Sequence, residues 1–459
     1  MDYTLSDLYT WSEKIEKMAV DCGLEFYPQE FEIVNYDDML AYEVYLGMPS
    51  RYPHWSFGKA YEKLKTLYRY NLTGLPYEMV INSDPCIAYL LKENSLLLQI
   101  LTIAHVYGHN DFFKNNRLFK IGTDAKYTIE SFKNHARTIR SYINDPSIGY
   151  ENVEMVLNAA HSLKLQIART VGERKLTQEE IKQKLLDTYN DQHSNYNTLE
   201  PPKEIDPPDL TKIPLEPYED IIYFLMEYGD LTEWQQNLLS IVREETKYFI
   251  PQIETKIMNE GWASYWHYRI LQKLDLPQSL HLEFIKRHND VVAPQRGGLN
   301  PYYLGFEIYH DLVERYGEDK IFEVRLLDRD ESFIRRYLTE DLCAKLNLFE
   351  YKKKGSDYVV EEISDELGWE KIRSDLSNNV GMGLIPLIRV TDLNKKDKCL
   401  FLEHVYDGRE LQCKYAEETL KYIASLWGAR VELKTIMDNK KTIISCDEQN
   451  KVSIITYAQ

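Results

Sequence analysis

Residues 95–113, SLLLQILTIAHVYGHNDFF, constrain the fold more than any other segment of this sequence. Apolar residues occupy nearly every position of its first half, so they would cover all sides of a helix and predict a helix buried in a core. Two histidines, His105 and His109, lie four residues apart within it. This spacing places both imidazoles on one side of the helix, one turn apart, where they can share a metal ion.

A second largely apolar segment, residues 250–274, also carries polar groups: IPQIETKIMNEGWASYWHYRILQKL. Pro251 predicts a new helix starting at Gln252. Glu260 and His267 are seven residues apart, two turns along one face. A buried carboxylate must be paired, protonated or bound to a metal.

Together the two segments predict a metal site. His105, His109 and Glu260 match the ligand set of a zinc site that keeps one position open, although iron or manganese would also suit these ligands. The alternative is a hydrogen-bonded cluster of core histidines and Glu260 without a metal. His267 is a candidate for an additional ligand or a catalytic donor.

A third segment, residues 151–165 (ENVEMVLNAAHSLKL), places Glu154, Asn158 and His161 along one face of an otherwise apolar helix. Glu154 and His161 are further catalytic candidates, and this face can also supply a second metal or groups that orient the first ligands. Each residue alone is more often structural. The Glu-x-x-His spacing of di-iron bundles is missing from this segment.

The zinc-hydrolase motif H-E-x-x-H is also absent, because Val106 occupies the position of its glutamate. Hydrolysis therefore needs a base from elsewhere, and Glu154, Asp111 and Glu244 are candidates. A structural metal, or chemistry other than peptide hydrolysis, is the alternative interpretation.

Charge and composition narrow the classes of function. Lys plus Arg is 55 and Asp plus Glu is 73, a net charge of −18. A chain this acidic lacks the basic footprint of a general nucleic-acid binder. No uninterrupted apolar run reaches the ~18 residues of a membrane span, and the N-terminus lacks the basic start and apolar run of a signal peptide. Six cysteines without a C-x-x-C pair favour a reducing compartment, so we expect a cytoplasmic protein.

The pattern along the chain predicts two domains. Residues 1–320 read as a large, mainly α domain interrupted by a Pro-rich excursion at 194–217. Residues 321–459 read as a smaller α+β module. Its expected strands are Tyr358–Glu362, Leu387–Thr391, Cys399–His404, Arg430–Thr435, Thr442–Cys446 and Val452–Tyr457, with helices at Asp365–Ser377 and Arg409–Trp427.

Long motifs distributed over nearly the whole chain resemble those of the SpoVR family, named for stage V sporulation protein R. They are MPSRYPHWSFGKAYE, YEMVINSDPCIAYLLKENSLLLQ, IAHVYGHNDFFKNN, ETKIMNEGWASYWHYRI, RGGLNPYYLGFEIY, LEHVYDGREL and TLKYIASLWGARVEL. The resemblance implies a role in forming the spore cortex, the peptidoglycan layer of bacterial endospores. It also implies partners in a sporulation or stress pathway, because relatives are often encoded beside a serine protein kinase and a von Willebrand A-like protein.

The segment NEGWA, which contains Glu260, also resembles the Glu-Gly-Trp-Ala segment of some helical zincin-like hydrolases. This resemblance implies a zincin-like helical domain with Glu260 as a ligand beside His105 and His109. The leading hypothesis is a metal-dependent amide hydrolase acting on a peptide or a wall precursor. The rival hypothesis is a non-catalytic scaffold or regulatory partner, which Val106 favours.

Overall fold

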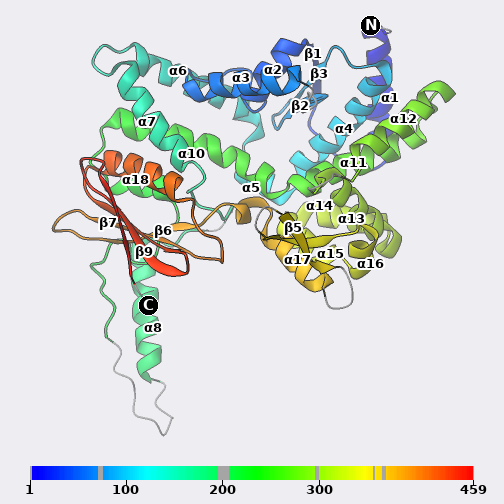
Figure 1. Cartoon of the computed structure of the whole chain (residues 1–459). Helices are drawn as coiled ribbons and strands as arrows, with labels where there is room; N and C mark the ends of the chain where they lie inside the picture. Colours follow the sequence, from blue (N-terminus) through cyan, green and yellow to red (C-terminus); the bar gives the residue numbers. More distant parts are fainter. Residues whose placement is uncertain are drawn as a thin grey trace. The chain divides into compact units, whose positions relative to one another are not determined.

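The computed structural model describes residues 3–70, 76–172, 174–194, 206–294, 299–354, 357–363 and 368–457. Contacts divide the chain into two compact units (Figure 1). The first contains residues 1–141 and 247–384, and the second contains residues 142–246 and 385–459. The boundary expected at 320/321 falls inside helix α14, and residues 321–384 belong to the first unit.

The first unit is mostly helical. Its helices are α1 (Leu5–Asp21), α2 (Tyr36–Val44), α3 (Trp55–Arg69), α4 (Leu96–Asn115), α5 (Arg117–Gly122), α11 (Lys256–Lys273), α12 (Gln278–Val291), α13 (Pro301–Tyr316), α14 (Glu318–Leu327), α15 (Asp330–Tyr337), α16 (Glu340–Lys345) and α17 (Trp369–Asn378), with 3-10 turns η1 (Ala125–Tyr127) and η2 (Gly381–Leu384). A strand pair, β4 (Phe349–Lys354) and β5 (Asp357–Ile363), follows α16.

A small sheet precedes the buried helix of the first unit. β1 (Gln29–Val34) pairs in parallel with β3 (Cys86–Leu91), and β2 (Glu78–Ile81) pairs antiparallel with β3 on the other side. A short turn leads from β3 into α4, where the Ser95 side chain accepts a hydrogen bond from the backbone N–H of Leu98 and caps the helix. The sheet therefore places β2 beside the start of α4.

The core of the first unit is a row of three closely packed helices, in which α11 lies between α4 and α13. Every residue of α4 from Leu97 to Phe113 is buried, which confirms the prediction of a helix enclosed on all sides. A close contact sets the spacing of α4 and α11. A Cβ at Gly108 would lie 2.6 Å from the Cα of Ala263, so only glycine allows α4 to approach α11 this closely. Trp262 and Trp266 of α11 are buried in the same hydrophobic core as Ala104 and Tyr107 of α4.

The prediction that Pro251 starts a helix is wrong. Pro251 lies inside α10 (Glu233–Glu254), and the break comes at Thr255, before α11 begins. The carboxylate of Asp330 explains the position of this break, because it accepts hydrogen bonds at 2.9 Å from the backbone N–H groups of both Ile257 and Met258. These two N–H groups in the first turn of α11 have no partner within the helix itself.

The second unit combines helices with a five-stranded sheet. Its helices are α7 (Gly149–Leu163), α8 (Gln178–Ser194), α9 (Ile221–Tyr228) and α18 (Cys413–Trp427), while α6 (Thr128–Asn144) and α10 run from one unit into the other. The sheet order is β10-β9-β8-β7-β6, formed by β6 (Ile388–Leu393), β7 (Leu400–His404), β8 (Val431–Met437), β9 (Lys440–Cys446) and β10 (Val452–Thr456).

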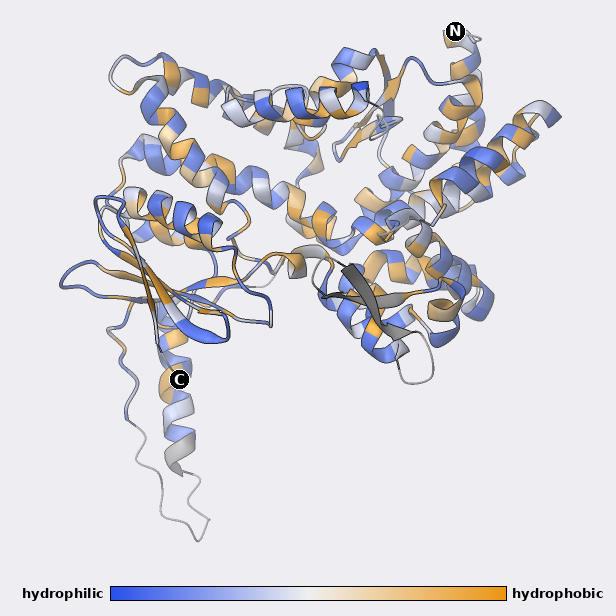
Figure 2. Cartoon of the chain, in the orientation of Figure 1, coloured by the Kyte–Doolittle hydropathy of each residue, from blue (hydrophilic) through white to orange (hydrophobic). Residues whose placement is uncertain are grey.

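The C-terminal strands and helices predicted from the sequence are confirmed, with shifts of a few residues at their ends. Residues 365–367, at the start of the predicted helix Asp365–Ser377, lie outside the described residues. The helix α18 packs on β8 and β9, and Figure 2 shows hydrophobic and hydrophilic residues alternating around it. Its buried residues are Leu420, Ile423, Ala424, Leu426 and Trp427. The predicted excursion at 194–217 falls partly outside the described residues, at 195–205. Among the helices of the described chain, none combines the length and hydropathy that crossing a membrane requires.

Candidate metal centre

The crossing of α4 and α11 brings the predicted ligands together. His109 and His105 project from α4, and Glu260 projects from the first turns of α11. The Oε2 atom of Glu260 lies 3.5 Å from Nε2 of His109 and 3.8 Å from Nε2 of His105. The close approach of Gly108 to Ala263 holds the two helices at this separation.

A fourth group comes from the small sheet. Oε1 of Glu78, at the start of β2, lies 3.9 Å from Nε2 of His105. The ligand atoms of Glu78, His105 and His109 all lie within 4.8 Å of one another. Two ligand atoms that are each about 2.0–2.2 Å from one zinc ion lie roughly 3–4 Å apart, so the observed separations match those of groups arranged around a cation.

Two buried atoms at the centre of this cluster lack hydrogen-bond partners. They are Nε2 of His105 and Oε2 of Glu260, and neither finds a partner among the residues that the structure describes. Their 3.8 Å separation is too long for a hydrogen bond. Because an unpaired buried polar atom is costly, a ligand that both atoms can bind would remove the penalty. The residues present therefore fit a divalent cation.

The far sides of both imidazoles are held by hydrogen bonds. Nδ1 of His109 lies 2.9 Å from Oδ1 of Asn259, an atom that only accepts, so the ring proton of His109 is on Nδ1 and Nε2 keeps its lone pair. Nδ1 of His105 lies 2.9 Å from Nδ1 of His267. Partners of this kind orient histidine ligands and fix their tautomers in metal sites.

Burial and neighbouring charges set the protonation of these groups. Burial, followed by the repulsion of His105, lowers the pKa of His109 to about 4. Burial also lowers the pKa of His267 well below its ordinary value. Both rings are therefore neutral near pH 7, and neutral imidazole is the form that binds metals.

The pKa values of the two carboxylates, Glu78 and Glu260, shift in opposite directions. Burial raises the pKa of Glu78 above its ordinary value. Burial would also raise the pKa of Glu260, but the neighbouring His105 and His109 outweigh it and hold that pKa below its ordinary value. The negative charge of Glu260 and burial raise the pKa of Tyr302, at the start of α13, so its hydroxyl keeps its proton.

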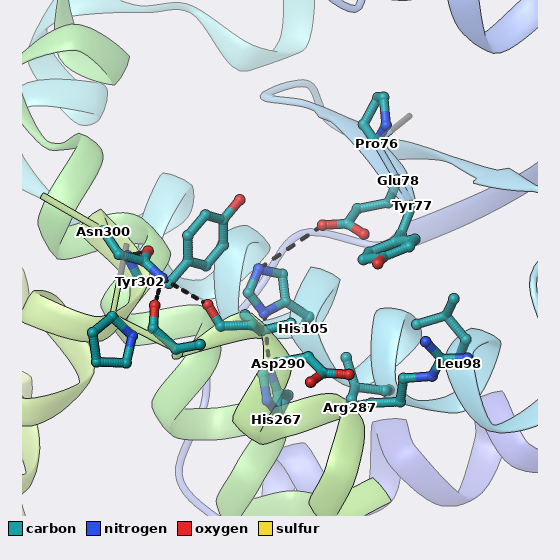
Figure 3. Close-up of a pocket in the computed structure, with 14 residues that line it drawn as sticks. Pro76, Tyr77, Glu78, Leu98, His105, His267, Arg287, Asp290, Asn300 and Tyr302 are labelled. Atoms are coloured by element: carbon teal, nitrogen blue, oxygen red, sulfur yellow. Dashed lines mark hydrogen bonds and ion pairs between the residues drawn. The ribbon is translucent and has the colours of Figure 1, made fainter. Parts of the chain in front are cut away.

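The cluster opens into a cavity of about 510 Å³. Figure 3 shows Glu78, His105 and Tyr302 directed toward this space from β2, α4 and α13. The remaining lining residues are Pro76, Tyr77, Leu98, Leu101, His267, Arg287, Asp290, Val291, Ala293, Pro294 and Asn300. The Glu260 side chain is 19% exposed, so the centre is accessible to a small ligand although both histidines are buried.

The other sequence candidates lie outside the cluster of Glu78, His105, His109 and Glu260. His267 packs behind His105 and faces its Nδ1 atom, on the side opposite Nε2. Glu154 and His161 lie on α7 in the second unit, where Glu154 accepts a hydrogen bond from the Tyr150 hydroxyl. Glu244 also lies in the second unit and pairs with Arg243.

Asp111 makes contacts that hold helices together. Its Oδ2 accepts a hydrogen bond at 2.9 Å from Nε1 of Trp262 and lies 3.3 Å from the Arg325 guanidinium. These contacts hold α4 against α11 and α14, and Asp111 is not among the residues that line the cavity.

Sequence reasoning missed Glu78, Tyr302 and Asn259. Glu78 and Tyr302 lie in segments that were identified only as family-like motifs, in a short strand and at a helix start. A signal for Asn259 was available, because it directly precedes Glu260 on a helix otherwise rich in apolar residues.

Comparisons with known proteins cover nearly the whole chain. A family model described as "SpoVR like protein" matches residues 2–385, and one described as "SpoVR-like C-terminal domain" matches residues 386–438. The chain is 33% identical over 476 aligned positions to the "Uncharacterized protein YcgB" of Escherichia coli (strain K12), an alignment covering 94% of this chain and 92% of the relative. No solved structure matches the chain.

Proposed function

Because this chain belongs to the SpoVR family, we propose that it acts in the process for which the family is named, formation of the spore cortex, as a metal-dependent amide hydrolase. One observation carries the proposal. Nε2 of His105 and Oε2 of Glu260 lie 3.8 Å apart, without hydrogen-bond partners among the described residues, beside a cavity of about 510 Å³. Zinc is the metal that two imidazoles and a carboxylate favour.

His105, His109 and Glu260 would hold the metal. When bound, a divalent cation polarises a carbonyl group and lowers the pKa of a coordinated water molecule. Glu78 lines the cavity close to His105. It supplies the carboxylate that α4 lacks, because Val106 occupies the position of the glutamate in H-E-x-x-H. It takes the proton of the attacking water and returns it to the amide nitrogen that leaves.

Tyr302 acts as a hydrogen-bond donor in the proposed reaction. Its hydroxyl is protonated because the charge of Glu260 and burial raise its pKa, and it lines the same cavity. A protonated hydroxyl there can donate a hydrogen bond to the oxygen on which negative charge develops. The similarity of the NEGWA segment to helical zincin-like hydrolases supports a zincin-like assignment of Glu260.

Metal analysis tests the proposal directly. Protein purified without added metal should contain near-stoichiometric zinc, and the metal should be lost in His105→Ala and Glu260→Ala variants that remain folded. His310→Ala is a matched control, because His310 is a partly exposed histidine on α13 that pairs with Glu314. Metal content that is unchanged in both site variants would overturn the proposal.

A non-catalytic regulatory partner in a kinase-linked sporulation or stress pathway is the second candidate. The observation that favours it is Val106, which occupies the position where zinc hydrolases carry their glutamate. Its expected partners are a serine protein kinase and a von Willebrand A-like protein. Removal of the metal separates the candidates, because a purely structural ion would unfold the protein when it is chelated.

A further inference from the structure

Three buried histidines form a continuous hydrogen-bonded chain that leads away from the metal centre. Nδ1 of His105 lies 2.9 Å from Nδ1 of His267, and Nε2 of His267 lies 2.8 Å from Nδ1 of His288. The three rings come from α4, α11 and α12. None is more than 4% exposed.

The number of protons on these rings limits how the chain can be arranged. A hydrogen bond joins one donor to one acceptor, and a neutral imidazole offers one of each. His267 uses both of its nitrogens, so it must donate in one contact and accept in the other. The direction of the first hydrogen bond therefore fixes the direction of the second. Two arrangements remain, and they run in opposite directions.

The two arrangements give His105 opposite properties. In the outward arrangement, Nδ1 of His105 donates to His267, His267 donates from Nε2 to His288, and Nε2 of His105 keeps a lone pair for a metal. In the inward arrangement, His288 donates to His267, and His267 donates to Nδ1 of His105. The proton of His105 is then on Nε2, where it blocks coordination.

We propose that the direction of this histidine chain sets whether His105 can bind a metal, with His267 and His288 as positioning residues. The inference rests on the proposed metal centre and deepens it. The structure supports it because Nε2 of His105 faces both carboxylates, at 3.8 and 3.9 Å, an environment that suits a proton in the inward arrangement and a cation in the outward one.

Reversal of the chain conserves protons. When it turns outward, the proton on Nδ1 of His267 moves to Nδ1 of His105, and the proton on Nδ1 of His288 moves to Nε2 of His267. Nε2 of His105 releases one proton to water as the metal arrives, and Nε2 of His288 takes one proton from water. The three rings carry three protons before and after, so they remain neutral throughout.

His288 offers the cleanest substitution, because it is two hydrogen bonds from the ligand atom and its surroundings are aromatic. Its ring centroid lies 4.5 Å from that of Tyr268 and 5.0 Å from that of Phe306. Phenylalanine therefore fits the site but offers no acceptor to His267. Asparagine places a polar atom close to the position of Nδ1 and restores one. His281→Phe is the matched control, since His281 is an exposed histidine on the same helix.

Zinc affinity, measured on the full chain by competition with a chelator, tests the role of His288. We expect His288→Phe to raise the zinc Kd about 10–100-fold, His288→Asn to recover most of the affinity, and His281→Phe to leave it unchanged. An unchanged Kd in His288→Phe would overturn the inference. Equal losses in His288→Phe and His288→Asn would also overturn it, because they would show a packing effect.

A spectroscopic measurement on the unsubstituted protein needs no variant. The ¹⁵N shifts of histidine-labelled protein distinguish protons on Nδ1 from protons on Nε2. Saturation with zinc should move His267 and His288 to the Nε2-protonated form, with no imidazolium signal from either of these two rings. Zinc bound at His105 without this change of tautomer would overturn the inference about the histidine chain but not the proposed metal centre. Zinc binding that persists fully in His105→Ala would instead overturn the metal centre.

Discussion

Gly261 of α11 lies so close to Gly305 of α13 that a Cβ atom at Gly261 would be 2.4 Å from the Cα of Gly305. Each glycine adjoins a residue of the candidate site in the fold, because Gly261 follows Glu260 and Gly305 lies one helical turn after Tyr302. The separation of these two helices therefore determines how far Tyr302 is from the cluster on α4.

Gly261→Ala should destabilise the protein. The added methyl group meets backbone atoms, which cannot move aside as a flexible side chain would, and overpacking of this kind costs about 1–3 kcal/mol. Thermal unfolding measures the loss, and zinc content should fall with it. Gly58→Ala is the control, because no atom lies within 4 Å of a Cβ at that position of α3. Equal stability of the two variants would contradict the packing argument.

Glu260→Gln and Glu78→Gln should separate the roles of the two carboxylates. Glu260 faces both histidines, so its loss should remove most of the bound zinc. Glu78→Gln should keep near-stoichiometric zinc, because the proposed base is not one of the three ligands. Elemental analysis of both purified variants gives the answer, and loss of zinc in Glu78→Gln would reassign Glu78 as a ligand.

Asp111→Ala should cost about 3–5 kcal/mol of stability, because it leaves the buried Arg325 guanidinium without its carboxylate partner. It also removes the acceptor of the Trp262 indole N–H. Denaturant unfolding measures this loss. Adding Arg325→Met to Asp111→Ala should recover part of it, because the orphaned charge disappears. No recovery in the double variant would show that the ion pair is not the cause.

The stability of the protein should depend on the protonation of Asp330. Burial raises the pKa of this carboxyl to about 7 in the folded protein, against 3.8 as its ordinary value. A raised folded pKa means that its contribution to stability is present at low pH and is lost as the pH rises through about 7. Wild type should therefore lose stability relative to Asp330→Asn between pH 5 and pH 8.

Thermal unfolding at pH 5 and pH 8 compares the two proteins. Asp21→Asn, at an exposed position near the end of α1, is the control and should track the wild type at both pH values. A constant difference between wild type and Asp330→Asn would show that Asp330 does not titrate in this range.

The local patterns of α4 and α11 carried most of the information about the site. Their apolar character and the spacing of His105 and His109 predicted a buried helix that presents two imidazoles on one side, and the structure places Glu260 beside them. That they bind a metal stays a prediction. Periodicity succeeds here because both helices are long and their burial is nearly complete.

Other features depend on contacts that no local pattern encodes. Glu78 reaches the cluster because β2 pairs with β3, just before α4, and a single glutamate in a four-residue strand gives no periodic signal. The link from His267 to His288 depends on how α12 packs on α11. The division into two units could not be predicted from local sequence patterns either. The first unit consists of two separate stretches of the chain, and residues 142–246 between them belong to the second unit.

This interrupted order has a consequence for biosynthesis. The ribosome delivers α4 early, but its neighbours α11 and α13 emerge only after the whole intervening insertion has been translated. During that interval the apolar surface of α4 lacks the helices that cover it in the folded protein, and exposed apolar surface of this kind makes a nascent chain prone to aggregation. If His105, His109 and Glu260 hold a metal as proposed, binding can only follow translation of the insertion, because Glu260 lies after it.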